Sequence, residues 1–229
     1  HAGHRSPYPP DMTTAAQEGL LAIWHDVLAG REAEVTHWYN IEHHAERLSV
    51  DGFLSAHRYR LAGGEGRQFL SLYRTRNPAV LSSAAYRARL ESPTPRTQEI
   101  MPTYRNMTRT VCRLALQQGM PEGGHLATLA GAGAVPDPSI EKVFSALLQR
   151  PGVLRCRWLL PEDPALVARS TAEGALRGTD ASVTWAVLVD TNEAADALEV
   201  LSTLEAALRP GELAQRAADR MGYAGRSGA

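Results

Sequence analysis

The chain of 229 residues carries 24 lysine and arginine residues against 25 aspartate and glutamate residues, and its formal net charge is −1. This balance creates no overall field that would attract nucleic acid or an anionic membrane surface, and no apolar run approaches the roughly 20 residues that cross a bilayer. We therefore expect a cytoplasmic protein without a nucleic-acid or membrane partner. The two cysteines, Cys112 and Cys156, show no CxxC or metal-ligand spacing and are expected to be buried free thiols.

The first half of the chain predicts a β-α-β-β-α-β order, which is the ferredoxin-like split unit. Residues 1–12 have no apolar core of the kind found in a secretory signal and are interpreted as a tag remnant or a flexible arm. Strands are then predicted at 19–28, 53–61, 68–75 and 109–117, and helices at 33–49 and 78–90, the second capped by Asn77.

The second half predicts the same order of elements, so the chain contains an internal repeat. Strands are predicted at 126–134, 153–160, 183–190 and 221–226, and helices at 138–149 and 193–208; the polar connection 161–181 has room for a short helix of its own. We place the first repeat at 13–120 and the second at 121–229. Two such units can pack their bare sheet faces into one intrachain barrel, whereas the alternative is an independent sheet in each copy that pairs with another chain.

The second copy retains the apolar skeleton but loses the polar residues of the first. At the aligned positions His25 becomes Ala130, Glu42 becomes Lys142, His43 becomes Val143 and Arg47 becomes Leu147. We therefore expect the functional site to lie in the first repeat and the second repeat to be mainly structural.

The helix predicted at 33–49 carries the densest group of polar and aromatic residues. A regular helix turns by about 100° per residue, which predicts one buried stripe and places His43 and Arg47 nearly opposite to it. That stripe consists of Val35, Trp38, Ile41, Ala45 and Leu48. His43 and Arg47 can act in catalysis only if another element covers their face, and the segments 93–95 and 161–181 or a neighbouring subunit are candidates; otherwise they form weak pairs on a solvated surface.

Strand alternation assigns further side chains to faces. His57 and Tyr59 share one face of the strand 53–61, and Arg58 lies on the other. An apolar pocket formed by Tyr59, Tyr73 and Tyr86 with Trp24 or Trp38 is one interpretation, and an aromatic core is the other. Convergence of His25, His37 and His57 inside a barrel would make a metal site, but their spacing does not support one and we predict none.

The first copy resembles the EthD-like branch of the dimeric α/β-barrel superfamily. The resemblance covers residues 19 to about 118 and rests on the segments Trp38-Tyr39-Asn40-Ile41-Glu42-His43, Arg47-Leu48, Gly52-Phe53, Arg58-Tyr59, Leu72-Tyr73, Tyr86 and Pro93-Thr94-Pro95-Arg96-Thr97. It implies an α+β fold of two tandem ferredoxin-like repeats whose antiparallel sheets pack into an intrachain α/β barrel, with a cavity between sheet and helices. Members of the superfamily include cofactor-free monooxygenases, lactone isomerases, polyketide cyclases and haem enzymes.

These observations lead to the hypothesis of a small-molecule enzyme that acts on an apolar or aromatic, polyketide-like or xenobiotic, substrate. Histidine would transfer protons without a cofactor, as in an oxygenase, isomerase, cyclase or lyase. We assign His43 or His37 as the base, Glu42 as its partner, and Arg47 or Arg58 to steady negative charge. The substrate-binding candidates are Trp38, Tyr39, His25, His57, Arg58, Tyr73 and Tyr86. The alternatives are a non-catalytic ligand-binding or stress-response barrel and a haem- or metal-binding member; pairing of fused barrels into a homodimer stays open.

Overall fold

The computed structural model describes residues 18–62, 66–135, 139–163, 171–208 and 221–227, the last of these as backbone only. The arm predicted at residues 1–12 lies outside the described residues. Among the described helices, none is long and apolar enough to cross a membrane.

The first repeat contains four strands and the helices that cover one face of them. Its strands are β1 (Gly19–Val27), β2 (Phe53–Leu61), β3 (Phe69–Thr75) and β4 (Tyr104–Gly119). Between β1 and β2 lie α1 (Glu32–Trp38), a π-helical turn η1 (Tyr39–His43) and α2 (His44–Leu48); between β3 and β4 lie the short turn η2 (Pro78–Ser82), α3 (Ala84–Glu91), α4 (Pro95–Ile100) and η3 (Met101–Thr103).

The second repeat follows the same order in a shorter form. Its elements are β5 (His125–Gly131), α5 (Ile140–Leu147), β6 (Val153–Pro161), α6 (Ala172–Arg177), β7 (Trp185–Thr191), α7 (Ala194–Ala207) and β8 (Met221–Ser227). The connection 161–181 does carry a helix of its own, α6. The final strand is present although glycine-rich, because β8 pairs with both β5 and β2.

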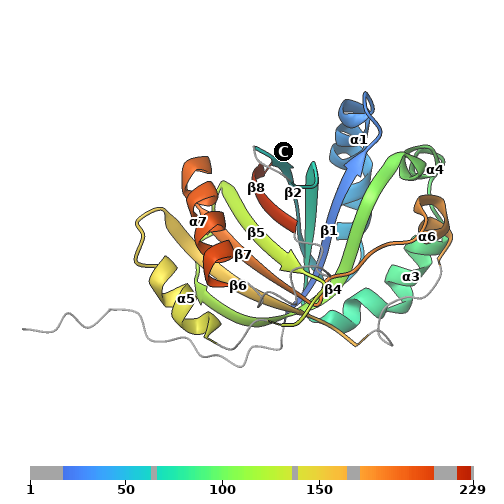
Figure 1. Cartoon of the computed structure of the whole chain (residues 1–229). Helices are drawn as coiled ribbons and strands as arrows, with labels where there is room; N and C mark the ends of the chain where they lie inside the picture. Colours follow the sequence, from blue (N-terminus) through green and yellow to red (C-terminus); the bar gives the residue numbers. More distant parts are fainter. Residues whose placement is uncertain (1–17, 63–65, 136–138, 164–170, 209–220, 228–229) are drawn as a thin grey trace, which may run out of the picture.

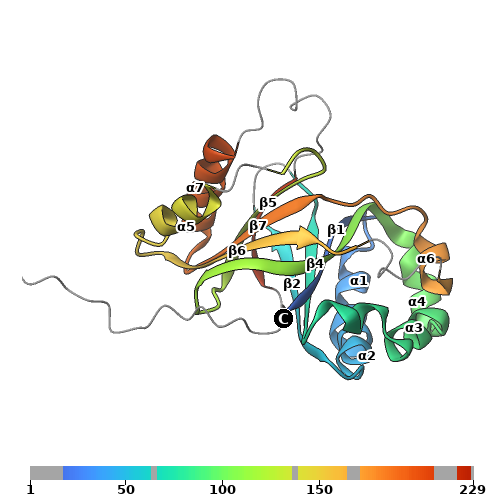
Figure 2. The same ribbon diagram turned by 90° about the horizontal axis from the view of Figure 1, so that it is seen from below.

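The eight strands form one closed antiparallel barrel in the order β1-β3-β2-β8-β5-β7-β6-β4. Each repeat contributes a four-stranded sheet, and the sheets join where β2 meets β8 and β4 meets β6. The predicted intrachain barrel is therefore confirmed, and the alternative of two independent sheets is wrong. The helices form two outer layers, with α5 and α7 on one side and the helices of the first repeat with α6 on the other (Figures 1 and 2).

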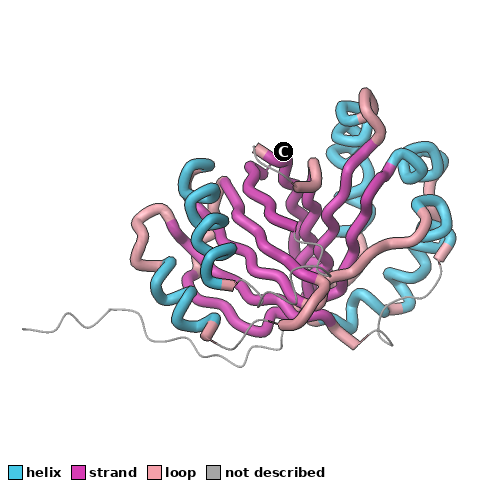
Figure 3. Tube along the Cα trace, viewed as in Figure 1, coloured by secondary structure: helices cyan, strands magenta, loops and turns pink. Residues whose placement is uncertain are grey.

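Three apolar clusters of described residues fill this architecture. One lies inside the barrel and includes Trp24, Leu70 and Leu188, and the other two lie between each sheet and its helices. Inside the barrel, Trp24 Nε1 donates a hydrogen bond of 3.3 Å to Thr128 Oγ1 and so links the two repeats. Strands such as β1 are covered on both faces, by the barrel interior and by helices (Figure 3), which explains why nearly all of their residues are buried.

Two helical predictions need correction. Asn77 does not cap a helix with its side chain; the chain makes the short turn η2, and α3 begins after Ser83, whose hydroxyl accepts a hydrogen bond of 3.2 Å from Tyr86 N. The predicted stripe on the first helix is wrong beyond Trp38, because Ile41 is 54% exposed and Leu48 is 43% exposed. The turn η1 contains one residue more per turn than an α-helix, which rotates all later residues by about 100°.

Candidate functional site

The candidate site lies between the outer face of the first sheet and the helices α1 to α4 and α6; we call this space the first helix–sheet layer. The strands direct His25, Arg58 and Tyr73 into it, since these residues alternate with side chains that face the barrel interior. His25 stacks on Tyr104 with ring centroids 4.3 Å apart, and Arg58 lies 4.4 Å above the centre of the Tyr39 ring.

The π-helical turn brings further polar residues into the same layer. Because of the rotation, Tyr39, His43 and Arg47 are at most 4% exposed, whereas a regular helix would have turned His43 and Arg47 outward. The ring of His43 lies 4.2 Å from that of Trp38 and 6.4 Å from that of Tyr73. The sequence-based placement of His43 and Arg47 opposite the buried stripe is therefore wrong.

Buried polar atoms without hydrogen-bond partners are concentrated in this layer. Such atoms are uncommon in folded proteins, and each one calls for an explanation. Seven of the eleven among the described residues lie here: His25 Nε2, His43 Nδ1, His44 Nε2, Arg58 Nε, Arg58 Nη2, Ser71 Oγ and Tyr73 OH. The layer therefore presents both donors and acceptors that no protein group satisfies.

His25 is held as a neutral ring with a defined tautomer. Its Nδ1 lies 3.2 Å from the carbonyl oxygen of Asp26, which fixes the proton on Nδ1 and leaves Nε2 as a free acceptor. Burial, followed by the nearby positive charge of Arg58, lowers the pKa of His25 to about 3.

The neighbouring titratable groups are neutral as well. Burial lowers the pKa of His43 well below its usual value, and the charge of Arg47 lowers it further. Burial and the charge of Arg58 lower the pKa of His44 to about 4. Burial also raises the pKa of Tyr73 well above its usual range, so its hydroxyl remains a donor at neutral pH. The positive charges of Arg47 and Arg58 act on these neutral rings.

Arg47 is already paired. Both carboxylate oxygens of Glu173, on α6, accept hydrogen bonds from its Nη2, and both side chains are almost fully buried. Burial alone would lower the pKa of Arg47, but the Glu173 carboxylate raises it above its usual value. Helix α6 thus covers Arg47, and it lies in the connection 161–181, which was one of the three candidates for the covering element. The pair commits Arg47 to structure, which contradicts its predicted role in steadying negative charge.

Glu42 does not orient a histidine. Its Oε1 accepts a hydrogen bond of 3.2 Å from Trp38 Nε1 and another from Thr94 Oγ1, and it thereby ties η1 to the start of α4. The carboxylate nearest to His43 is that of Glu46, 3.9 Å from Nδ1. The proposed pairing of Glu42 with His43 or His37 is therefore wrong.

Three other predicted site residues lie elsewhere. His57 and Tyr59 face the barrel interior with Trp24, and His57 Nε2 lies 3.8 Å from Glu122. His37 is exposed on α1. The three histidines His25, His37 and His57 therefore do not converge, and no group of potential metal ligands forms within the described ranges. Tyr73 and Tyr86 do share the first helix–sheet layer with Trp38, but Tyr59 does not.

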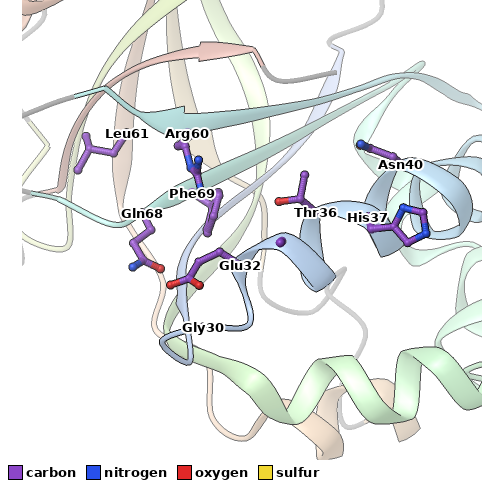
Figure 4. Close-up of a pocket in the computed structure, with 10 residues that line it drawn as sticks. Gly30, Glu32, Thr36, His37, Asn40, Arg60, Leu61, Gln68 and Phe69 are labelled. Atoms are coloured by element: carbon purple, nitrogen blue, oxygen red, sulfur yellow. The ribbon is translucent and has the colours of Figure 1, made fainter.

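An open groove with a volume of about 780 Å³ borders this layer between α1 and the paired ends of β2 and β3. Figure 4 shows Glu32 and Thr36 on the helix, facing Arg60 and Phe69 on the strands and Gln68 just before β3, while the ring of His37 turns away from the strands at the rim. Asn40, Leu61, Gly30 and Ala33 complete its lining.

The second repeat has apolar side chains in the corresponding places. His25 lies opposite Phe69 where β1 pairs with β3, and Gly131 lies opposite Trp185 where β5 pairs with β7. By this register, His25 corresponds to Gly131 and Phe69 corresponds to Trp185. Arg58 corresponds to Trp158 by the same register. The rings of Trp158 and Trp185 stack 5.8 Å apart over Gly131. The sequence alignment of His25 with Ala130 was thus one residue out of register, since Ala130 faces the barrel interior.

Sequence reasoning missed Glu173, Thr36, Phe69 and Ser71 as parts of the site. Phe69 and Ser71 alternate with Leu70 and Leu72 and share a face with Tyr73, so strand alternation is a signal that could have found them. No local signal identified Glu173, because its partner lies 126 residues away in the chain.

Comparisons with known proteins find distant structural similarity and no family. No family model and no curated protein matches the chain. Among solved structures it is similar to an anthrone oxidase-like protein (TM-score 0.49, 11% identity, 93% of each chain covered) and to a variant of chlorite dismutase from Candidatus Nitrospira defluvii (TM-score 0.48, 11% identity, 95% and 92% covered). A haem-binding protein from Thermus thermophilus matches at a TM-score of 0.43 and 10% identity, over 92% and 91% of the two chains. Similarity at this level carries no argument about activity, and the EthD-like branch stays a prediction.

Proposed function

We propose that the protein is a small-molecule enzyme that binds an apolar or aromatic substrate in the first helix–sheet layer and transfers a proton through a neutral histidine. The observation that supports this proposal is the gathering of unsatisfied buried donors and acceptors among aromatic rings in one repeat. A pocket that is largely apolar, with a few convergent polar groups, is typical of small-molecule sites.

His25 and His43 are the proposed proton acceptors, and Tyr73 is the proposed donor to a substrate oxygen. His25 has the better-defined free lone pair, since its Nδ1 is held by the Asp26 carbonyl. With a pKa of about 3 it is a weak base in the resting protein. The positive charge of Arg58 contributes to that low pKa. A negatively charged substrate group beside Arg58 would offset this charge and make His25 a stronger base.

The reaction class proposed here is proton abstraction from carbon, as required of a cofactor-free oxygenase, isomerase, cyclase or lyase. Purified protein would be incubated in D₂O with a panel of aromatic ketones and enolisable polyketide-like compounds, and exchange of carbon-bound protons would be followed by NMR. We expect exchange with one substrate class, and loss of about a hundredfold or more in rate in His25→Gln or His43→Gln.

The matched control is His57→Gln, which changes a histidine on the opposite face of the same sheet and should leave the exchange rate unchanged. If the wild type exchanges no proton but retains ligands of this class, the alternative of a non-catalytic binding barrel replaces the proposal. A haem spectrum in freshly purified protein would contradict cofactor-free chemistry and favour the haem-binding alternative.

A further inference from the structure

Arg58 is a buried cation without a counterion. Its side chain is 6% exposed, and it forms no ion pair with an acidic residue in the described part of the chain. Nη1 donates a hydrogen bond of 2.9 Å to Thr36 Oγ1, whereas Nε and Nη2 have no partner. An isolated buried charge is costly unless an opposite charge and hydrogen bonds compensate for it.

Aromatic rings surround the guanidinium but do not neutralise it. It lies 4.0 Å from the centre of the Phe69 ring and 4.4 Å from that of Tyr39. Cation–π contacts of this kind stabilise a cation in part, but rings carry no net charge. The surplus charge is also felt by its neighbours, since Arg58 is the second cause of the low pKa of both His25 and His44.

Arg58 lies directly behind the wall of the open groove. Thr36 and Phe69, two of the residues that Arg58 contacts, both line the groove, and the guanidinium carbon of Arg60 lies 5.6 Å from the centre of the same Phe69 ring. Arg60 is exposed at the groove and, within the described residues, forms no ion pair. Glu32 is the single acidic residue among the lining residues that the structure describes.

The second repeat shows that the fold itself does not need this cation. The residue in register with Arg58 is Trp158, which packs on Trp185 in an apolar layer. The same position is therefore satisfied by a hydrophobic side chain when no charge has to be recognised.

We propose that the groove binds an aromatic carboxylate whose ring packs on Phe69 and whose carboxylate pairs with Nε and Nη2 of Arg58, while Nη1 keeps its hydrogen bond to Thr36 and Arg60 lies at the mouth. The planar guanidinium matches a carboxylate with two parallel hydrogen bonds, and its unpartnered Nε and Nη2 are donors of the required kind. The proposal names the substrate class of the proposed function and rests on it for the location of the site.

The test compares 2-naphthoate with its neutral counterpart 2-naphthamide by isothermal titration calorimetry. We expect naphthoate to bind the wild-type protein at least about tenfold more tightly than naphthamide, and Arg58→Gln to abolish that preference. Arg87→Gln removes an exposed arginine from α3, outside the groove lining, and should leave the preference unchanged.

Equal affinity for the two probes, or a preference that survives in a folded Arg58→Gln variant, would overturn the inference. If Arg58→Gln does not fold, the Nε–H signal of Arg58 in the wild-type NMR spectrum replaces it. That signal should shift on addition of naphthoate but not of naphthamide, and an unchanged signal overturns the inference. Arg58-dependent binding without proton exchange would leave this inference standing while the proposed catalytic function fails, so the two are distinguishable.

Discussion

The buried pair of Arg47 and Glu173 gives the sharpest test of how the first helix–sheet layer is held together. Glu173→Gln keeps the size of the side chain but removes the charge that compensates Arg47. Both side chains are at most 5% exposed, so water cannot replace the lost carboxylate. Breaking one partner of a buried pair costs about 3–5 kcal/mol, which corresponds to a fall in melting temperature of about 6–20 °C for a chain of this size.

The assay is reversible denaturation in urea, with the free energy of unfolding compared between wild type and variants. Glu199→Gln is the matched control, because its pair with Arg150 is partly exposed and should contribute no more than about 1 kcal/mol. The double variant Arg47→Met with Glu173→Leu should recover most of the loss, since two apolar side chains leave no buried charge. A loss below about 1 kcal/mol in Glu173→Gln would refute the reasoning, because the pair would then not be closed to solvent.

Three further outcomes are expected. In the wild type, the pKa of His25 is about 3 in the folded state and lies below the unfolded value, so the free energy of unfolding decreases as pH falls below 6.5. His25→Asn should therefore flatten this pH dependence between about pH 6 and pH 4 by up to about 1.4 kcal/mol per pH unit. Equal slopes in urea titrations of variant and wild type would contradict this. Ile41→Ser should change stability by less than about 0.5 kcal/mol, while Trp38→Ala should cost about 3–5 kcal/mol, and similar losses would show that η1 is a regular α-helical turn. Gly52→Ala should be more destabilising than Gly30→Ala: both glycines have positive φ, but a Cβ at Gly52 would lie 2.6 Å from Val80 Cγ2 and one at Gly30 would meet nothing within 4 Å. Thermal melts of the two glycine variants would decide the last point, and equal melting temperatures would count against the steric argument.

The internal repeat and the order of elements could be predicted because they depend on local patterns. Alternation of side chains is visible wherever a strand has two different faces, and it separated His57 and Tyr59 from Arg58. It did not show which of the two faces points into the barrel, so His25 was grouped with His57 although the structure places the two histidines on opposite faces of the sheet. Tyr59 faces the barrel interior and Tyr73 faces the helix layer, so the two cannot line one pocket. Alternation alone could not show this, because it does not relate the faces of one strand to those of another.

The candidate site was predicted only in part. Tyr73 and Arg58, both named from the sequence, do lie in the first helix–sheet layer, whereas the partners of Glu42 and Arg47 were not foreseen. Glu42 bonds Thr94 and Arg47 bonds Glu173, and these partners are 52 and 126 residues away in the sequence. Such pairings are decided by packing of whole elements, and no spacing rule contains them.

By itself, the sequence determined the two ferredoxin-like repeats and the loss of polar residues from the second, because both follow from hydrophobic periodicity and from comparison of the two copies. It showed that bare sheet faces need cover, but only the pairing of β2 with β8 and of β4 with β6 decided that the two sheets close into one barrel. Only the tertiary structure decided which side of the first helix is buried. The extra residue in η1 rotates His43 and Arg47 from the predicted solvent side toward the sheet, since a helix packs in the register that buries the most side-chain surface, and a π-turn changes that register without leaving a pattern in the sequence.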